Sequence, residues 1–323
     1  GDALKKIKEL KPDVVTMDIE MPVLNGLEAL QTIMKAHPVP VVMLSSTTQN
    51  GAENTILACS YGAIDFVAKP SGSISLDLHK IKEELIQKVL SASRVDIKQL
   101  AKVDNGVKST TNRNENYSKI EREVRKEKTL KDSSKKLVCI GTSTGGPRAL
   151  QIVITKLPKA IEFPVFVVQH MPAGFTKSLA ERLNSLSEVV VKEAEHGEVV
   201  KNGTVYIAPG GMHLTVRKLG NNLTLHVDES TPPQNGHRPS VDVLFESISR
   251  LEDYIKVAVI MTGMGSDGTK GLIELKKSRN VTAIAESQKT SIVFGMPKAA
   301  ISTNLVDEIN NVENIAETIL KYV

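Results

Sequence analysis

The sequence predicts an α/β protein made of two doubly wound parallel-sheet domains joined by a linker. Short apolar runs alternate with amphipathic runs of helical period on both sides of residues 94–136, which is the pattern of strands and helices in such sheets. Residues 94–136 break this alternation, because large apolar residues are scarce there. The chain has 323 residues, 41% of them hydrophobic, and is therefore long enough for two cores.

The first domain is expected to span residues 1–93. It opens on a helix, since Ala3, Leu4, Ile7 and Leu10 recur at helical spacing before Lys11-Pro12 ends the run. Apolar runs then predict strands at 14–17, 41–44 and 65–67, separated by helices at 26–36, 53–61 and 76–92.

Three strand ends of this domain carry groups suited to phosphate chemistry. Asp18, Ser45 and Lys69 follow the three strands, and ligands of open parallel sheets collect at the carboxyl ends of strands. A carboxylate, a hydroxyl and an ammonium group could accept and hold a phosphoryl group. Taken alone, Asp18 is equally consistent with capping the helix that begins near Asn25.

Residues 94–136 are expected to form a solvated linker. They hold 13 basic and 7 acidic residues, a composition that buries too little surface to offset the entropy lost on ordering. A nucleic-acid patch is the alternative, but the acids are interleaved with the bases and Tyr117 is the only aromatic residue nearby. The whole chain has a net charge of +4, only 3% aromatic residues and no Trp, so nucleic acid is not an expected partner.

The second domain is expected to span residues 137–323, again as a three-layer α/β fold, with a β hairpin inserted. An apolar run leads through Gly141–Gly146 into Pro147, which reads as strand, tight turn and helix. The same reasoning predicts further strands at 163–168, 189–192, 205–208, 256–261 and 281–285, and a hairpin that turns at 219–222. Helices are predicted at 147–157, 176–186, 239–251 and 308–321.

Ser143 lies at the bend of the first turn of this domain. Its flanking glycines fit G-x-S-x-G, in which a strand-to-helix turn lifts a serine oxygen clear of the sheet. Ser143 is therefore the candidate nucleophile. Two other readings stay open for the pattern alone: a turn needed only for chain reversal, and a phosphate cradle of a dinucleotide site.

Two further strand ends supply the partners that a serine nucleophile needs. His170 follows the strand at 163–168, and Asp267 lies in the glycine-rich turn after the strand at 256–261. In acyl transfer a histidine takes the serine proton, an aspartate orients the imidazole, and backbone N–H groups receive the oxyanion. Glycines around Met264 would let the backbone approach that oxyanion. The other histidines are poorer candidates, because they fall in loops, in the hairpin or in the first domain: His37, His79, His196, His213, His226 and His237.

With these residues in place, the second domain resembles the catalytic domain of the chemotaxis protein-glutamate methylesterases, the CheB family. The segments IGTSTGGP, VVQHMP, IAPGGMH, RPSVDVLF, MTGMGSDG and TSIVFGMP carry the resemblance across nearly all of residues 137–323. It implies a triad of Ser143, His170 and Asp267, with the Met264 amide in the oxyanion hole and Thr144 beside the nucleophile. It also implies a cofactor-free serine esterase that removes methyl groups from chemoreceptor glutamates and deamidates glutamines there.

Residues 1–93 resemble the second half of a response-regulator receiver domain through VVTMDIEMPVLNG, VVMLSS and GAIDFVAKP. The resemblance implies Asp18 as phosphoacceptor, Ser45 as switch hydroxyl and Lys69 as the phosphate-binding lysine, with a chemotaxis histidine kinase as phosphodonor. The family's first strand, with the acidic pair that binds Mg²⁺, has no counterpart here. We therefore expect a partial receiver domain whose Asp18 strand is an open edge and whose phosphorylation is doubtful.

Two other functions compete with an esterase. A nucleotide-binding oxidoreductase would use 141–146 as a pyrophosphate turn, but G-x-G-x-x-G is not met, and the strand about 20 residues on ends in His170 rather than an acid. The other competing function is that of a non-enzymatic binding module controlled by phosphorylation.

The cellular setting is expected to be the cytoplasm. Cys59 and Cys139 stand far apart in apolar contexts, which predicts buried free thiols in a reducing compartment. No apolar run approaches the roughly 20 residues of a membrane helix, so membrane insertion is not expected.

Overall fold

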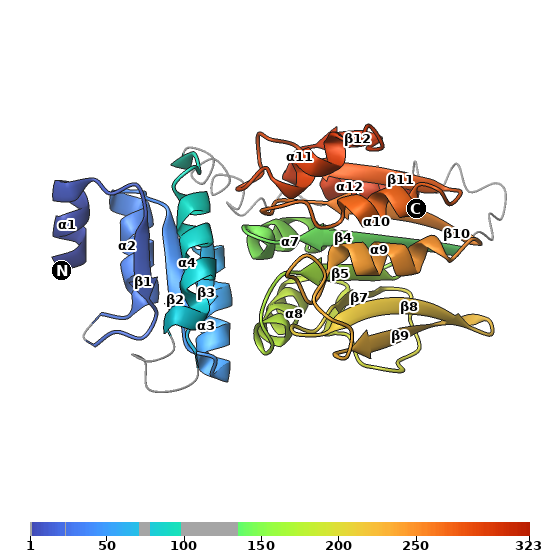
Figure 1. Cartoon of the computed structure of the whole chain (residues 1–323), viewed down its shortest axis with the longest axis horizontal. Coiled ribbons are helices and arrows are strands. Elements are labelled where there is room, and N and C mark those ends of the chain that lie inside the picture. The colour runs from blue at the N-terminus through green and yellow to red at the C-terminus, as the bar shows by residue number, and fades with distance from the viewer. Residues whose placement is uncertain (1, 23, 71–77, 98–134) are drawn as a thin grey trace.

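The structure is a computed structural model that describes residues 2–22, 24–70, 78–97 and 135–323 (Figure 1). Most of the predicted linker lies outside these residues. Within them the chain forms a three-stranded sheet, a seven-stranded sheet and a two-stranded hairpin. Both larger sheets are entirely parallel, which confirms the predicted α/β class.

The first sheet has the order β1-β2-β3. Its strands are β1 (Val15–Asp18), β2 (Val41–Ser45) and β3 (Asp65–Ala68), and its helices are α1 (Asp2–Leu10), α2 (Gly26–Ala36), α3 (Gln49–Ser60) and α4 (Leu78–Ala92). The elements follow the prediction except that α3 begins four residues earlier than expected, because Thr48 caps it by accepting a hydrogen bond from the Gly51 amide. Asn25 caps α2 by accepting from the Leu27 amide, so the alternative that Asp18 caps this helix is wrong.

The second sheet has the order β12-β11-β10-β4-β5-β7-β6. Its strands in chain order are β4 (Lys135–Thr142), β5 (Val165–Gln169), β6 (Val190–Glu193), β7 (Thr204–Ile207), β10 (Tyr254–Ile260), β11 (Val281–Glu286) and β12 (Glu308–Asn310). Strand β4 therefore begins two residues inside the stretch predicted as linker. It stands at the centre of the sheet between β10 and β5, so the strands that lead to Ser143, His170 and Asp267 are neighbours.

Helices cover both faces of this sheet and bury successive β4 side chains in opposite directions. Val138 and Ile140 pack with α7 (Gly146–Ile154), α8 (Phe175–Leu186) and α12 (Val312–Tyr322). Leu137 and Cys139 pack with α9 (Val241–Ser249), α10 (Thr269–Leu275) and α11 (Met296–Ile301). A central strand buried on both faces reads as a continuous apolar run, as 137–141 does.

Three elements of the second domain differ from the sequence prediction. The C-terminal helix begins at Val312 rather than at 308, since Glu308–Asn310 pairs with β11 as the edge strand β12. Helices α10 and α11 were not predicted, because seven and six residues are too few to show a helical period. The predicted hairpin is confirmed as β8 (His213–Leu219) and β9 (Asn222–Asp228), which are antiparallel.

The two domains share buried contacts. Helix α3 packs against α7 and α8, and the ring of Phe66 in β3 stacks on that of Phe175 in α8 with centroids 4.6 Å apart. Figure 1 shows α3 and α4 on the side of the first domain that faces α7 and α8. The first domain therefore sits at the end of the second sheet where the candidate site residues lie.

Both cysteines are buried and unpaired, as predicted. Burial raises the pKa of the Cys59 thiol to about 12, so it stays protonated. Among the helices in the described ranges, none has the length and apolar character needed to cross a membrane.

Glu286 at the end of β11 makes stability depend on pH. Its carboxyl is 1% exposed and accepts hydrogen bonds from the Thr262 amide and the Thr290 hydroxyl. Burial raises its pKa from 4.5 to about 7, so between these values the unfolded chain releases a proton that the folded chain keeps. The contribution of Glu286 to stability is therefore greatest below pH 4.5 and is lost as pH rises towards 7. Over this range the free energy of unfolding falls by about 3 kcal/mol.

We predict that Glu286→Gln stabilises the protein above pH 7 and not at pH 4.5. The neutral amide can occupy the same volume without an ionisation cost. The check is denaturant unfolding at both pH values, with the exposed Glu317→Gln as matched control. An equal effect of Glu286→Gln at both pH values would contradict the shifted pKa.

Candidate active site

The turn that carries Ser143 is locked by its neighbours. Gly145 has a φ of +78° and forms the N-cap of α7, a conformation that favours glycine. A Cβ on Gly146 would lie 1.9 Å from the Gln169 side-chain oxygen, so only glycine fits there. The Gln169 amide nitrogen donates to the Ser143 carbonyl at 2.9 Å, and the Ser143 amide donates to the Thr262 carbonyl at 3.0 Å. Ser143 itself stays partly exposed.

His170 lies directly beyond β5 and is held at both ends. Its backbone amide donates to the Thr142 carbonyl at 3.1 Å, which places it beside the Ser143 turn. Its ring Nε2 is 2.7 Å from Asp267 Oδ2, and its side chain is 8% exposed. Nδ1 is buried and has no hydrogen-bond partner among the described residues.

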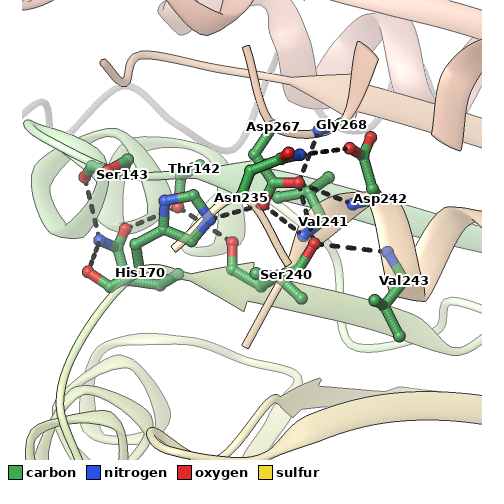
Figure 2. A network of polar contacts seen from close by, with 12 residues as sticks. Thr142, Ser143, His170, Asn235, Ser240, Val241, Asp242, Val243, Asp267 and Gly268 are labelled. Atoms are coloured by element: carbon green, nitrogen blue, oxygen red, sulfur yellow. Dashed lines mark hydrogen bonds and ion pairs between the residues drawn. The ribbon is translucent and has the colours of Figure 1, made fainter. Parts of the chain in front are cut away.

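Asp267 stands in the turn before α10, and its carboxylate lies against the N-terminus of α9, as Figure 2 shows. Its Oδ1 accepts from the Ser240 hydroxyl at 2.9 Å and from the Asp242 and Gly268 amides at 3.1 and 3.0 Å. Its Oδ2 accepts from the Val241 amide at 2.7 Å as well as facing His170. Burial alone would raise the pKa of Asp267, but His170 and the helix amides outweigh it and hold that pKa well below its usual range.

An ionised Asp267 determines the tautomer of His170. A carboxylate only accepts hydrogen bonds, so the proton of the neutral imidazole must stand on Nε2. Nδ1 then keeps its lone pair and is the nitrogen that can take a proton.

Asp242 is a second buried carboxylate beside Asp267. Its Oδ1 accepts from the Gly271 amide at 2.7 Å, which ties α9 to α10. Burial and the charge of Asp267 raise the pKa of Asp242 to about 6, although the Gly271 amide opposes this shift. No role was predicted for Asp242 or Ser240 from the sequence. Their signal was the segment RPSVD, in which a serine follows a proline just before a helix.

The loop that contains Met264 approaches the Ser143 turn closely. A Cβ on Gly263 would lie 2.8 Å from the Ser143 Cβ, so glycine is needed for this approach. The Gly263 amide donates to the Val293 carbonyl at 3.0 Å, which fixes the loop against residues 293–296. The residue before Met264 therefore contacts the Ser143 turn, while the oxyanion role of the Met264 amide stays a prediction.

Thr144 is buried and contacts the first domain. Its hydroxyl donates to Asp65 Oδ2 at 2.5 Å, across the domain boundary. Lys88 of α4 lies 3.1 Å from Asp65 Oδ1 and 2.9 Å from Glu84 Oε1. Burial disfavours the charge on Lys88, but Asp65 and Glu84 outweigh it and raise the Lys88 pKa. A buried ion pair of the first domain therefore holds the residue next to Ser143.

Helix α4 also contacts the Met264 loop. The Ser91 hydroxyl lies 2.9 Å from the Met264 sulfur. A cavity of about 350 Å³ separates the two elements and is lined by Leu90, Ser91, Met264 and Phe294 among others. The first domain thus covers the edge of the sheet at which Ser143 emerges. Asp65, Lys88 and Ser91 were not predicted from the sequence, because long-range contacts leave no local pattern.

Of the three predicted phosphate-site residues, the structure brings two together. Lys69 Nζ lies 2.5 Å from Asp18 Oδ2, and the Glu20 amide donates to Asp18 Oδ1 at 3.0 Å. The buried Ser45 hydroxyl instead donates to the Gly51 carbonyl at 3.0 Å and accepts from Thr55 at 2.7 Å. Ser45 is therefore turned towards α3 in this state.

The described residues do not form a Mg²⁺ site. In the ranges that the structure covers, no group of three or more His, Cys, Asp or Glu side chains could hold a metal. The Asp18 carboxylate is paired with Lys69, and that of Glu20 accepts from the Ser46 hydroxyl. Mg²⁺ prefers several oxygen ligands in an octahedron, which these two engaged carboxylates do not supply.

Comparisons with known proteins match both domains to known families. Residues 138–319 match the family described as CheB methylesterase, and residues 1–82 match the response regulator receiver domain. The protein-glutamate methylesterase/protein-glutamine glutaminase of Geobacillus kaustophilus is 56% identical over 325 residues, covering 100% of this chain and 88% of the relative. The protein of the same name from Bacillus subtilis is 51% identical, covering 98% of this chain and 87% of the relative.

A solved structure is similar to the second domain. The crystal structure of the Thermotoga maritima CheB methylesterase catalytic domain matches with a TM-score of 0.56 and 46% sequence identity. The match covers 59% of this chain and 100% of that one. Together with the two family matches, this similarity confirms the resemblance noted in the sequence: the receiver for the first domain and the methylesterase for the second.

Proposed function

Because the chain belongs to the CheB methylesterase family, we propose that it hydrolyses glutamate methyl esters on chemotaxis receptors with Ser143, His170 and Asp267 as its triad. One observation carries the assignment of roles: His170 is bound through Nε2 to an ionised Asp267, which leaves Nδ1 as the base. All three residues lie beyond the neighbouring strands β5, β4 and β10.

The proposed reaction follows the two stages of serine esterases. Ser143 Oγ attacks the ester carbonyl as its proton passes to His170 Nδ1, and Asp267 stabilises the resulting imidazolium. The Met264 amide receives the oxyanion. His170 then returns the proton to the departing methoxide, so methanol leaves and an acyl-enzyme remains. Water attacks this ester with His170 again as base, which releases the glutamate carboxylate and restores Ser143.

Glutamine deamidation is proposed as a second activity of the same site. The relatives carry both activities in their name. Only the leaving group changes: His170 protonates an amide nitrogen, ammonia leaves, and the same acyl-enzyme is hydrolysed to glutamate.

The dinucleotide alternative is disfavoured by the packing of the glycine turn. A Cβ on Gly145 would meet Ile292 at 2.7 Å, and one on Gly146 would meet Gln169. The space beside these glycines is filled by side chains of the protein itself, so the turn has no open space in which a pyrophosphate could bind.

The direct test of function is methanol release from a methylated receptor fragment incubated with the full chain. We expect release that depends on the enzyme, and no binding of a dinucleotide in a parallel titration. Absence of methanol together with dinucleotide binding would contradict the esterase function and favour the nucleotide-binding oxidoreductase.

The receiver domain is proposed to inhibit this esterase when it is packed against the Ser143 turn, as it is in the structure. The Asp65–Thr144 hydrogen bond is buried and its acceptor is charged, a class of bond worth about 1.5–3 kcal/mol. The role of a chemotaxis histidine kinase as phosphodonor to Asp18, which the receiver resemblance implies, stays untested, as does the expected cytoplasmic location.

We predict that Asp65→Ala raises the rate of methanol release by about tenfold or more, because it removes the acceptor that holds the first domain on Thr144. Steady-state assays on the full chain check this, with the exposed Glu28→Gln of α2 as control. An unchanged or lower rate from folded Asp65→Ala would show that this contact does not restrain the site.

A further inference from the structure

His237 stacks directly on His170. The two ring centroids are 3.9 Å apart and the rings are 7° from parallel. His237 lies in the loop between β9 and α9, whereas His170 follows β5, so the stack is a tertiary contact. The loop residues before it, 231–236, are exposed, while His237 is partly buried.

The loop that carries His237 is fixed on both sides of the ring. The backbones of His237 and Gln234 exchange two hydrogen bonds of 2.9 Å, and the Arg238 carbonyl accepts from the Gly211 amide at 3.0 Å. Two residues later Ser240 donates to Asp267. One short segment therefore supplies the ring that faces His170 and a hydroxyl that fixes the partner of His170.

His237 is neutral under the conditions in which His170 acts as a base. Burial, and next the positive charge of His170, lower the pKa of His237 to about 4, although Asp267 opposes this shift. The π-face of a neutral aromatic ring attracts a cation placed over it. The stacked ring thus favours the imidazolium that forms when His170 takes a proton.

We propose that His237 is a positioning residue for His170, whose stacked ring fixes the imidazole plane with Nδ1 towards Ser143 and stabilises the transient imidazolium. The Asp267 hydrogen bond restrains only one edge of the imidazole, since Nδ1 has no partner among the described residues. The parallel ring supplies the missing restraint against rotation. The inference rests on the proposed esterase function and adds a residue that the triad does not include.

The test compares His237→Ala with His237→Phe in the full chain. Alanine removes the stack and is expected to lower kcat for methanol release about 10- to 100-fold, with KM changed less than about twofold, because orientation acts on the chemical step. Phenylalanine keeps the flat ring without its nitrogens and is expected to stay within about threefold of the parent. His226→Ala is the matched control: it removes a hairpin histidine whose ring meets that of His196 in the loop after β6, and it should leave kcat unchanged.

A second readout separates this proposal from the function on which it rests. The rate at which a fluorophosphonate labels Ser143 depends on the base but not on a receptor substrate, and it should fall with alanine and recover with phenylalanine. If the parent chain labels but releases no methanol, the proposed function fails and the labelling rates still decide the role of His237. Equal losses in both variants, no loss in alanine, or no labelling of the folded parent chain would overturn the positioning role.

Discussion

Replacing Ser143 by alanine is expected to lower methanol release from methylated receptor by about a thousandfold or more. The substitution removes the oxygen that would form the acyl-enzyme, and the remaining oxyanion donors give only residual rate. Stability should hardly change, because Ser143 is partly exposed and its backbone hydrogen bonds do not involve the hydroxyl. The check is a methanol-release assay together with thermal unfolding of the same preparation.

The exposed Ser185 of α8 provides a matched control for this variant. Ser185→Ala should keep the parent rate, which shows that loss of a serine hydroxyl alone is harmless. Near-parental activity of Ser143→Ala would remove Ser143 from the mechanism and with it the proposed triad.

Replacing Asp267 by asparagine is expected to lower kcat by about 10⁴-fold, through the tautomer of His170. Oδ1 of Asp267 accepts three hydrogen bonds, from Ser240, Asp242 and Gly268, so the amide oxygen should occupy that position. The amide nitrogen then faces His170 Nε2 and donates to it. The imidazole proton is forced onto Nδ1, and the base is lost while the side-chain shape is kept.

The same variant is also expected to be less stable, and this loss checks which way the new side-chain amide is oriented. The new amide nitrogen also faces the Val241 amide, which loses its acceptor, so unfolding should require less denaturant. Asp253→Asn, at an exposed carboxylate bound to Lys218, is the control and should change neither quantity much. A loss in kcat of less than tenfold for Asp267→Asn would contradict the assigned tautomer.

The sequence was sufficient to predict which strand ends meet. Short apolar runs fixed β4, β5 and β10 as parallel strands, and the residues just beyond them were the ones with acyl-transfer chemistry. The sequence therefore predicted that Ser143, His170 and Asp267 lie at one edge of the sheet. That β10, β4 and β5 pair side by side is shown by the structure and was not predicted.

Other features could not be read from the chain, for physical reasons. Which nitrogen of His170 faces Asp267 depends on a side-chain rotation that no spacing encodes. The Asp65–Thr144 contact joins residues 79 positions apart through domain packing. The strand β12 was mistaken for the start of a helix, because a three-residue edge strand with polar side chains has no period of its own.

The most direct measurement for the proposed mechanism is to map the residue that a fluorophosphonate modifies in the full chain. Serine hydrolases react with this reagent through the activated nucleophile, so the adduct reports the nucleophile and its base together. The proposed triad predicts a single adduct on the peptide that contains Ser143, formed far more slowly in Asp267→Asn. An adduct on another residue, or none from a folded chain that still releases methanol, would contradict it.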